Sequence, residues 1–236
     1  MELDGNTIIE DVSISADRGE LVSLLGMSGS GKTTLFNCIS GIYDPTKGKV
    51  FLDGRDITGT TGNMSYMLQK DMLLPHKKII DNVALPLIIR GEQKEAARKK
   101  AGAHFSRFGL EGTEEYYPAQ LSGGMRQRAA LLRTYMFSDK VALLDEPFSA
   151  LDTITRRSIQ SWYLDIMKDI NLTTLFITHD INEAILLSDR IYVMTGKPGR
   201  IAGEVSVAFP REERDNFDMR EEFLDYKRRL MDLMSR

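Results

Sequence analysis

Residues 26–33, Gly-Met-Ser-Gly-Ser-Gly-Lys-Thr, carry the clearest chemistry in this chain. They match the pattern Gly-x4-Gly-Lys-Ser/Thr, in which glycines let the backbone curl so that N–H groups point at a β-phosphate. Lys32 supplies a mobile positive charge to the β- and γ-phosphates, and the Thr33 hydroxyl is a Mg²⁺ ligand. The helix that begins there adds its positive N-terminal end. The predicted phosphate loop comprises Gly26, Met27, Ser28, Gly29, Ser30, Gly31, Lys32, Thr33 and Thr34.

Two adjacent acids follow a second apolar run. Val141-Ala-Leu-Leu is typical of a buried strand, and it leads directly into Asp145 and Glu146. Ligands gather at the carboxyl ends of strands in open α/β sheets, so Asp145 can hold Mg²⁺ through water. Glu146 can polarise a water that attacks the γ-phosphate. The alternative is that the two acids begin a solvated turn before Pro147.

A second glycine-containing segment precedes a helical pattern. Small residues at Ser122-Gly123-Gly124 expose backbone N–H groups, and a helix start of this kind binds anions. One nucleotide on one chain hardly needs two such cradles. Two chains packed head-to-tail do need them, because each chain then completes the other's site.

These segments resemble the motifs of ABC transporter ATPases. Leu121–Arg128 is similar to the family's signature motif, and Gln69 to its Q-loop. Ser149–Asp152 resembles the D-loop, and Ile177–Asp180 resembles the segment with the switch histidine. With the phosphate loop and the acidic strand end, they stand in the family's order across residues 26–180.

The resemblance implies a role for each matched residue. Glu146 and His179 are the expected catalytic residues, ATP and Mg²⁺ the expected cofactors, and Asp152 part of a dimer interface. Simpler explanations are a polar strand end for Gln69, a core histidine for His179 and a helix N-cap for Asp152. The expected metal ligands are Thr33, Gln69 and Asp145. The residues expected to act on the ATP of a second copy are Ser122, Gly123, Gly124 and Gln127.

Finer features resemble the ATPase subunits of nitrate, sulfonate and taurine importers. They are the run from Leu121 through Asp152 and the segment Gly196-Lys-Pro-Gly-Arg-Ile. This implies an ATP-hydrolysing subunit at the cytoplasmic face of the inner membrane. Its expected partners are a second copy in a head-to-tail ATP dimer, permease subunits and, indirectly, a substrate-binding protein. An exporter ATPase is the alternative.

The sequence departs from the family's pattern at two places, and one apolar run suggests a surface for a partner. Leu3 or Asp4 falls where the family places an aromatic residue that stacks on adenine. Leu131–Thr134 is bulkier than the helix usual there. The apolar run Met72–Pro75 suits a surface that receives a permease helix, or else it packs inside the chain.

The remaining pattern predicts an α/β fold: a P-loop NTPase core with a mostly parallel sheet. Apolar runs at Glu20–Leu25, Lys140–Leu144, Thr173–Thr178 and Arg190–Met194 read as buried strands. We expect one ATPase domain with an α/β core over residues 1–70 and 139–210 and an inserted helical subdomain over 71–138. A helix is also predicted within the insert over Glu92–Phe108. The tail, 211–236, is predicted as an amphipathic helix that buries Met219, Phe223, Tyr226, Leu230 and Leu233.

Composition narrows the class of protein. The 236 residues are 42% apolar and 28% charged, which excludes a disordered chain. A net charge of −3 argues against nucleic-acid binding through bulk electrostatics. The single Cys38, the acidic start and the lack of an 18-residue apolar stretch lead us to expect a soluble cytosolic protein.

Overall fold

The computed structural model describes residues 1–138, 140–214 and 216–235. The chain divides into two compact units, one formed by residues 1–64 and 172–236 and the other by residues 65–171. The division into an α/β core (1–70 and 139–210), a helical insert (71–138) and a tail (211–236) stays a prediction.

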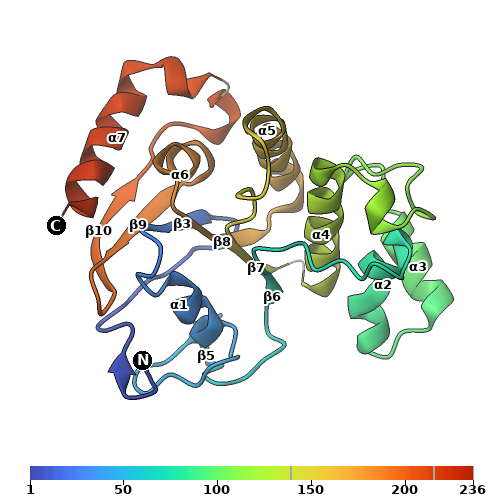
Figure 1. Ribbon diagram of the computed structural model, residues 1–236, viewed down its shortest axis with the longest axis horizontal. Helices are drawn as coiled ribbons and strands as arrows, with labels where there is room; N and C mark the ends of the chain where they lie inside the picture. Colours follow the sequence, from blue (N-terminus) through green and yellow to red (C-terminus); the bar gives the residue numbers. More distant parts are fainter. Residues whose placement is uncertain (139, 215, 236) are drawn as a thin grey trace. The chain divides into compact units, whose positions relative to one another are not determined.

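The first unit is built on a largely parallel sheet (Figure 1). Its strands are β3 (Leu21–Gly26), β8 (Thr173–Thr178), β9 (Arg190–Thr195) and β10 (Arg200–Ser206), in the order β10-β9-β3-β8. Strand β3 is buried along its whole length and runs parallel to both of its neighbours. The carboxyl ends of β3, β8 and β9 therefore meet at one edge of the sheet.

Three of these strands confirm the predictions from apolar runs. Strand β10 was not predicted. It pairs antiparallel with β9 at the sheet edge, and its register shifts between Ile201 and Gly203. Most side chains of β10 are exposed or half-buried. Its sequence therefore lacks the regular alternation of apolar and polar residues that predicts a strand.

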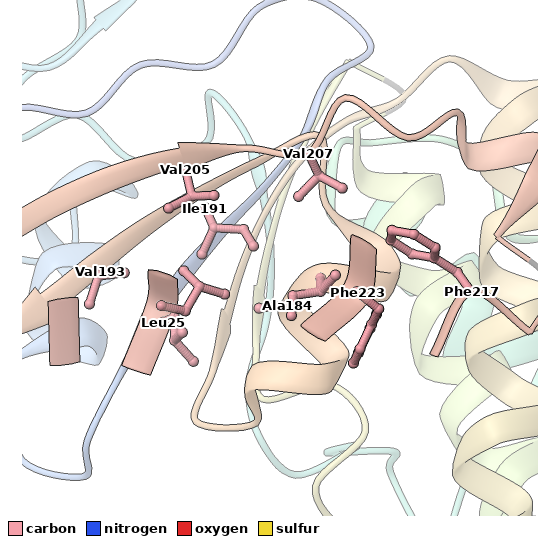
Figure 2. Close-up of a cluster of buried hydrophobic side chains, with 10 residues drawn as sticks. Leu25, Ala184, Ile191, Val193, Val205, Val207, Phe217 and Phe223 are labelled. Atoms are coloured by element: carbon pink, nitrogen blue, oxygen red, sulfur yellow. The ribbon is translucent and has the colours of Figure 1, made fainter. Parts of the chain in front are cut away.

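Helices α1 (Lys32–Ile39), α6 (Ile181–Leu187) and α7 (Glu221–Met234) also belong to this unit. Figure 2 shows the core that α6 and the tail share with the sheet. Phe223 and Leu230 are buried as predicted. The prediction for Met219 is wrong: it is 77% exposed, because the extended backbone at Arg220 delays the helix until Glu221. The buried members of the core are Leu25, Ala184, Ile185, Ile191, Val193, Val205, Val207, Phe217, Phe223 and Leu230.

Two short hairpins lie near the start of the chain. Strands β1 (Glu2–Leu3) and β2 (Asn6–Thr7) form the first, and β4 (Phe51–Leu52) and β5 (Arg55–Asp56) form the second. The turn between β1 and β2 has positive φ angles at Asp4 and Gly5, as a two-residue type I′ hairpin loop requires. The position of the family's adenine-stacking residue is therefore in this hairpin.

The second unit combines a strand pair with helices. Strand β6 (Ser65–Met67) is parallel to β7 (Val141–Asp145). Helix α2 (Ile79–Ile89) packs against α3 (Lys94–Gly102) and α4 (Gly123–Phe137) (Figure 1). Helix α5 (Thr153–Ile170) completes the unit.

Residues 71–138 contain no strand, as predicted. The observed helix α3, Lys94–Gly102, is shorter than the helix expected over Glu92–Phe108. Turns follow Gly102. Within the described ranges, every helix is too short or too polar to cross a membrane.

Candidate functional site

The predicted phosphate loop connects β3 to α1 in the first unit. Lys32 is buried at 5% exposure, and its Nζ donates to the carbonyl oxygens of Gly26 and Met27, each at 2.8 Å. Gly29 and Gly31 have φ angles of +80° and +94°, which glycine adopts without a steric penalty. A Cβ on Gly26 would collide with the Met194 carbonyl oxygen. Backbone conformation and close packing together fix this loop.

The predicted switch histidine lies at the same sheet edge of the first unit. Leu25 of β3 pairs with Thr178 of β8 in parallel register, so His179 follows its strand beside the residue that begins the phosphate loop. Asp180 then caps α6 by accepting hydrogen bonds from the N–H groups of Asn182 at 2.8 Å and Glu183 at 3.2 Å. The structure thus brings His179 and the loop together within one unit.

The two acids lie at the end of β7 in the second unit. Asp145 is the last residue of the strand and is 6% exposed. Glu146 turns away with a φ of +46°. Gln69 follows β6, which is parallel to β7, and its Nε2 donates to Glu146 Oε2 at 3.2 Å. Gln69 and the predicted catalytic base are therefore direct partners, which the sequence alone did not show.

The signature segment starts α4 as predicted. Ser122 is the N-cap, and its Oγ accepts a hydrogen bond from the Met125 N–H at 3.2 Å. Ser122 and Gly123 are exposed, so this helix start is open to a ligand. Gly124 is buried, and a Cβ there would lie 3.1 Å from Thr155 Cγ2 of α5. Glycine at 124 therefore has a packing reason of its own.

Gln127 contacts a segment of its own chain. Its side chain is 5% exposed, and its Nε2 donates to the Pro147 carbonyl oxygen of the same chain. Gln127 thus links α4 to the segment after Glu146, and its action on the ATP of a second copy stays a prediction.

The loop after Glu146 is held by further hydrogen bonds. Ser149 Oγ donates to the Glu146 carbonyl oxygen at 3.0 Å. Asp152 is the N-cap of α5 and accepts from the Thr155 N–H at 3.0 Å. Hydrogen bonds from the Thr155 side chain and backbone lower the pKa of Asp152. The simpler explanation of Asp152 as a helix cap is confirmed, and its place at a dimer interface stays a prediction.

Two arginines of α4, to which the sequence analysis gave no role, hold the segment that follows Gln69. Arg133 donates to the carbonyl oxygens of Met72, at 2.7 Å, and Asp71. Burial lowers the pKa of Arg133, and the charge of Asp71 acts in the opposite direction. Arg126 forms an ion pair with Asp71 at 3.4 Å. Their seven-residue spacing places both on one helix face, and that was the available signal.

The apolar run after Gln69 is only partly a surface. Met72 is 56% exposed, whereas Leu73 is 7% exposed and half-buried Leu74 is fixed through its N–H by Asn82 Oδ1 at 2.6 Å. The prediction of a partner surface is therefore wrong for Leu73, which packs inside the unit. Met72 remains available.

A phosphate loop that leads from a parallel strand into a helix, with an acidic strand end elsewhere in the chain, defines a P-loop nucleoside triphosphatase. Residues 9–149 match the family model described as ABC transporter. The chain belongs to the ABC transporter family, and it binds and hydrolyses ATP.

Curated relatives and a solved structure agree with this assignment. The chain is 42% identical to the formylaminopyrimidine import ATP-binding protein ThiZ of Halalkalibacterium halodurans, over 91% of this chain and 83% of ThiZ. It is 38% identical to the taurine import ATP-binding protein TauB of Yersinia pestis, over 88% of this chain and 82% of TauB. The dimeric post-hydrolysis structure of the ATP-binding cassette MJ0796, bound to ADP and Pi, is similar with a TM-score of 0.70 and 30% identity. That match covers 86% of this chain and 92% of MJ0796.

Proposed function

We propose that this chain is the ATP-hydrolysing subunit of an importer of small solutes, in the class of the nitrate, sulfonate and taurine importers. The observation that carries the proposal is the similarity to ThiZ and TauB, both named as import ATP-binding proteins, along most of all three chains. The segment Gly196–Ile201, which marks this class in the sequence, supports it.

The proposed roles follow from the chemistry of each side chain. Lys32 and the N–H groups of the loop bind the β- and γ-phosphates. Glu146, oriented by Gln69, is the general base that activates the attacking water. His179 contacts the γ-phosphate side from the end of β8.

Mg²⁺ is the proposed metal. The donors offered are the Thr33 hydroxyl, the Gln69 amide oxygen and the Asp145 carboxylate, and hard oxygen donors of this kind suit Mg²⁺. No cluster of three or more His, Cys, Asp or Glu side chains occurs among the described residues. When bound, the ion would neutralise charge on the phosphates.

Partners and location are also proposals. The exposed helix start at Ser122 and Gly123 suits the phosphates of ATP on a second copy, in a head-to-tail dimer. Exposed Met72 suits contact with a permease subunit. A substrate-binding protein would act indirectly, and the chain would be peripheral at the cytoplasmic face of the inner membrane. We further propose one ATPase domain with the core, insert and tail boundaries given above.

Reconstitution tests the proposal. The chain would be assembled in vesicles with the permease and binding protein encoded beside its gene. We expect uptake of a small solute that depends on ATP and on the binding protein. Efflux, or uptake that needs no binding protein, would favour the exporter alternative.

Sedimentation tests the composite site separately. In a Glu146→Gln variant, we expect a monomer or weak dimer without ATP and a dimer with ATP and Mg²⁺. A monomer under both conditions would count against a site shared between two copies.

A further inference from the structure

The segment Gly196–Ile201 lies against the phosphate loop. Strands β9 and β3 are parallel, with Met194 opposite Gly26. The chain that leaves β9 therefore emerges at the edge where the loop begins. Gly199 touches the Ser30 carbonyl oxygen so closely that a Cβ at 199 would overlap it.

Backbone hydrogen bonds fix this segment. The Gly199 N–H donates to the Ile8 carbonyl oxygen at 2.9 Å, and its own carbonyl accepts from the Glu10 N–H at 3.0 Å. Residues 8–10, which make these bonds with Gly199, also pack against the phosphate loop. A Cβ on Gly31 of the loop would lie 2.5 Å from Ile9 Cγ2. The position of Lys197, two residues before Gly199, is therefore defined.

Lys197 carries its charge to the loop. A methyl group placed on Gly29 would lie 3.6 Å from Lys197 Nζ, so the ammonium group lies beside the loop backbone. The side chain is exposed, and it forms no ion pair or hydrogen bond with a side chain of the described residues. Arg200, by contrast, is paired with Glu10 at 2.7 Å. The two cations of this segment thus differ in their contacts.

We propose that Lys197 is a second phosphate-binding cation, which attracts the polyphosphate of ATP from outside the loop while Lys32 acts within it. Lys32 is held near Gly26 and Met27 by its carbonyl contacts. An ammonium on a flexible stem beside Gly29 can reach a phosphate that the loop cradles. The proposal rests on ATP binding by this chain and not on the direction of transport.

Nucleotide titration of Lys197→Met tests it. Loss of one exposed charge near the phosphates is expected to raise the Kd for ATP about five- to tenfold at low salt. The change for ADP should be smaller, and adenosine binding should be unaffected. The difference between parent and variant should shrink at high salt, because an exposed charge is screened. Melting temperature should be unchanged.

Matched variants separate charge from packing. Lys197→Arg should keep the affinity of the parent, and Lys197→Glu should bind ATP more weakly than Lys197→Met. Arg229→Met removes the same charge from the exposed face of α7 and should leave the Kd unchanged. If Lys197→Met does not fold, Lys197→Gln gives the same comparison.

Several results would overturn the proposal. These are parent-like ATP affinity in the Met variant, equal weakening for adenosine and ATP, or a loss that Lys197→Arg shares. A change in Kd that depends on protein concentration would assign Lys197 to contact with a second copy. Lys32→Ala serves as the check on the loop itself: if it binds ATP like the parent, the phosphate loop assignment fails, whatever Lys197 does.

Discussion

The starts of α1 and α4 are both glycine-rich, and they use glycine for different reasons. At α1, Gly31 is the N-cap in a left-handed conformation, and no side chain of the described residues caps the helix. At α4, the Ser122 hydroxyl caps the helix, and the glycines have no positive φ. Gly124 is needed because α5 packs against it.

This difference shows what each segment is built for. The first turn of α1 follows a glycine N-cap that offers no side chain, an arrangement typical of phosphate loops, which bind anions through helix N–H groups. The first turn of α4 satisfies one N–H internally and packs against α5, and Gln127 in the next turn bonds to Pro147. The α4 start thus holds its own chain together as well as offering an exposed end.

The largest expected effect separates binding from chemistry. Glu146→Gln should lower kcat roughly 10²- to 10⁴-fold, because it removes the general base. Its ATP affinity should stay near that of the parent. Lys32→Ala should lose both affinity and rate, since Lys32 acts in the ground state and the transition state. Steady-state ATPase assays beside nucleotide titrations measure both quantities.

His179→Ala is the control for that pair. It should resemble Glu146→Gln more than Lys32→Ala, because its expected contact is with the γ-phosphate side only. Hydrolysis at the parent rate by Glu146→Gln would show that the base is another residue.

The next effect tests the glycines directly. Gly31→Ala should destabilise the chain by more than about 2 kcal/mol, because alanine is strained at a left-handed φ and its Cβ would meet Ile9. Gly123→Ala should cost less than about 1 kcal/mol, since its nearest neighbour, Leu151 Cδ2, would be at 3.7 Å. Urea unfolding of both variants gives the comparison. Equal losses would remove the distinction between the two helix starts.

A smaller loss is expected at the link between α4 and Pro147. Gln127→Met fills the same space but leaves the Pro147 carbonyl without its donor, which should cost about 1–3 kcal/mol. ATP-dependent dimerisation should persist, because the amide faces its own chain. Sedimentation and urea unfolding check both points. A parent-like unfolding free energy with weakened dimerisation would instead favour the predicted role in trans.

The smallest effect concerns pH. The pKa of Asp152 is lowered in the folded chain, so its contribution to stability is present above the unfolded value, about 3.9. That contribution is lost as the pH falls through the lower folded value. The melting temperatures of the parent and Asp152→Ala should therefore differ at neutral pH and converge in acid. A difference that grows in acid would contradict the cap.

Sequence patterns predicted the structure correctly where a feature of a few neighbouring residues determines it. The phosphate loop, three buried strands of the first unit and the strand that ends at Asp145 were predicted because short apolar runs and glycine spacing act within a few residues. Strand β10 and the start of α7 were missed. One is a polar edge strand, and the other depends on an extended Arg220 that no pattern marks.

The sequence by itself determined the chemistry on offer: which residues can bind phosphate, hold Mg²⁺ or act as a base. Only the tertiary structure decided which contacts the side chains make and which side chains are buried. Gln127 turned out to be bonded to Pro147, Leu73 to be buried and Lys197 to lie beside Gly29. Such contacts join residues far apart in the chain, and packing selects them, so residue type and spacing cannot specify them.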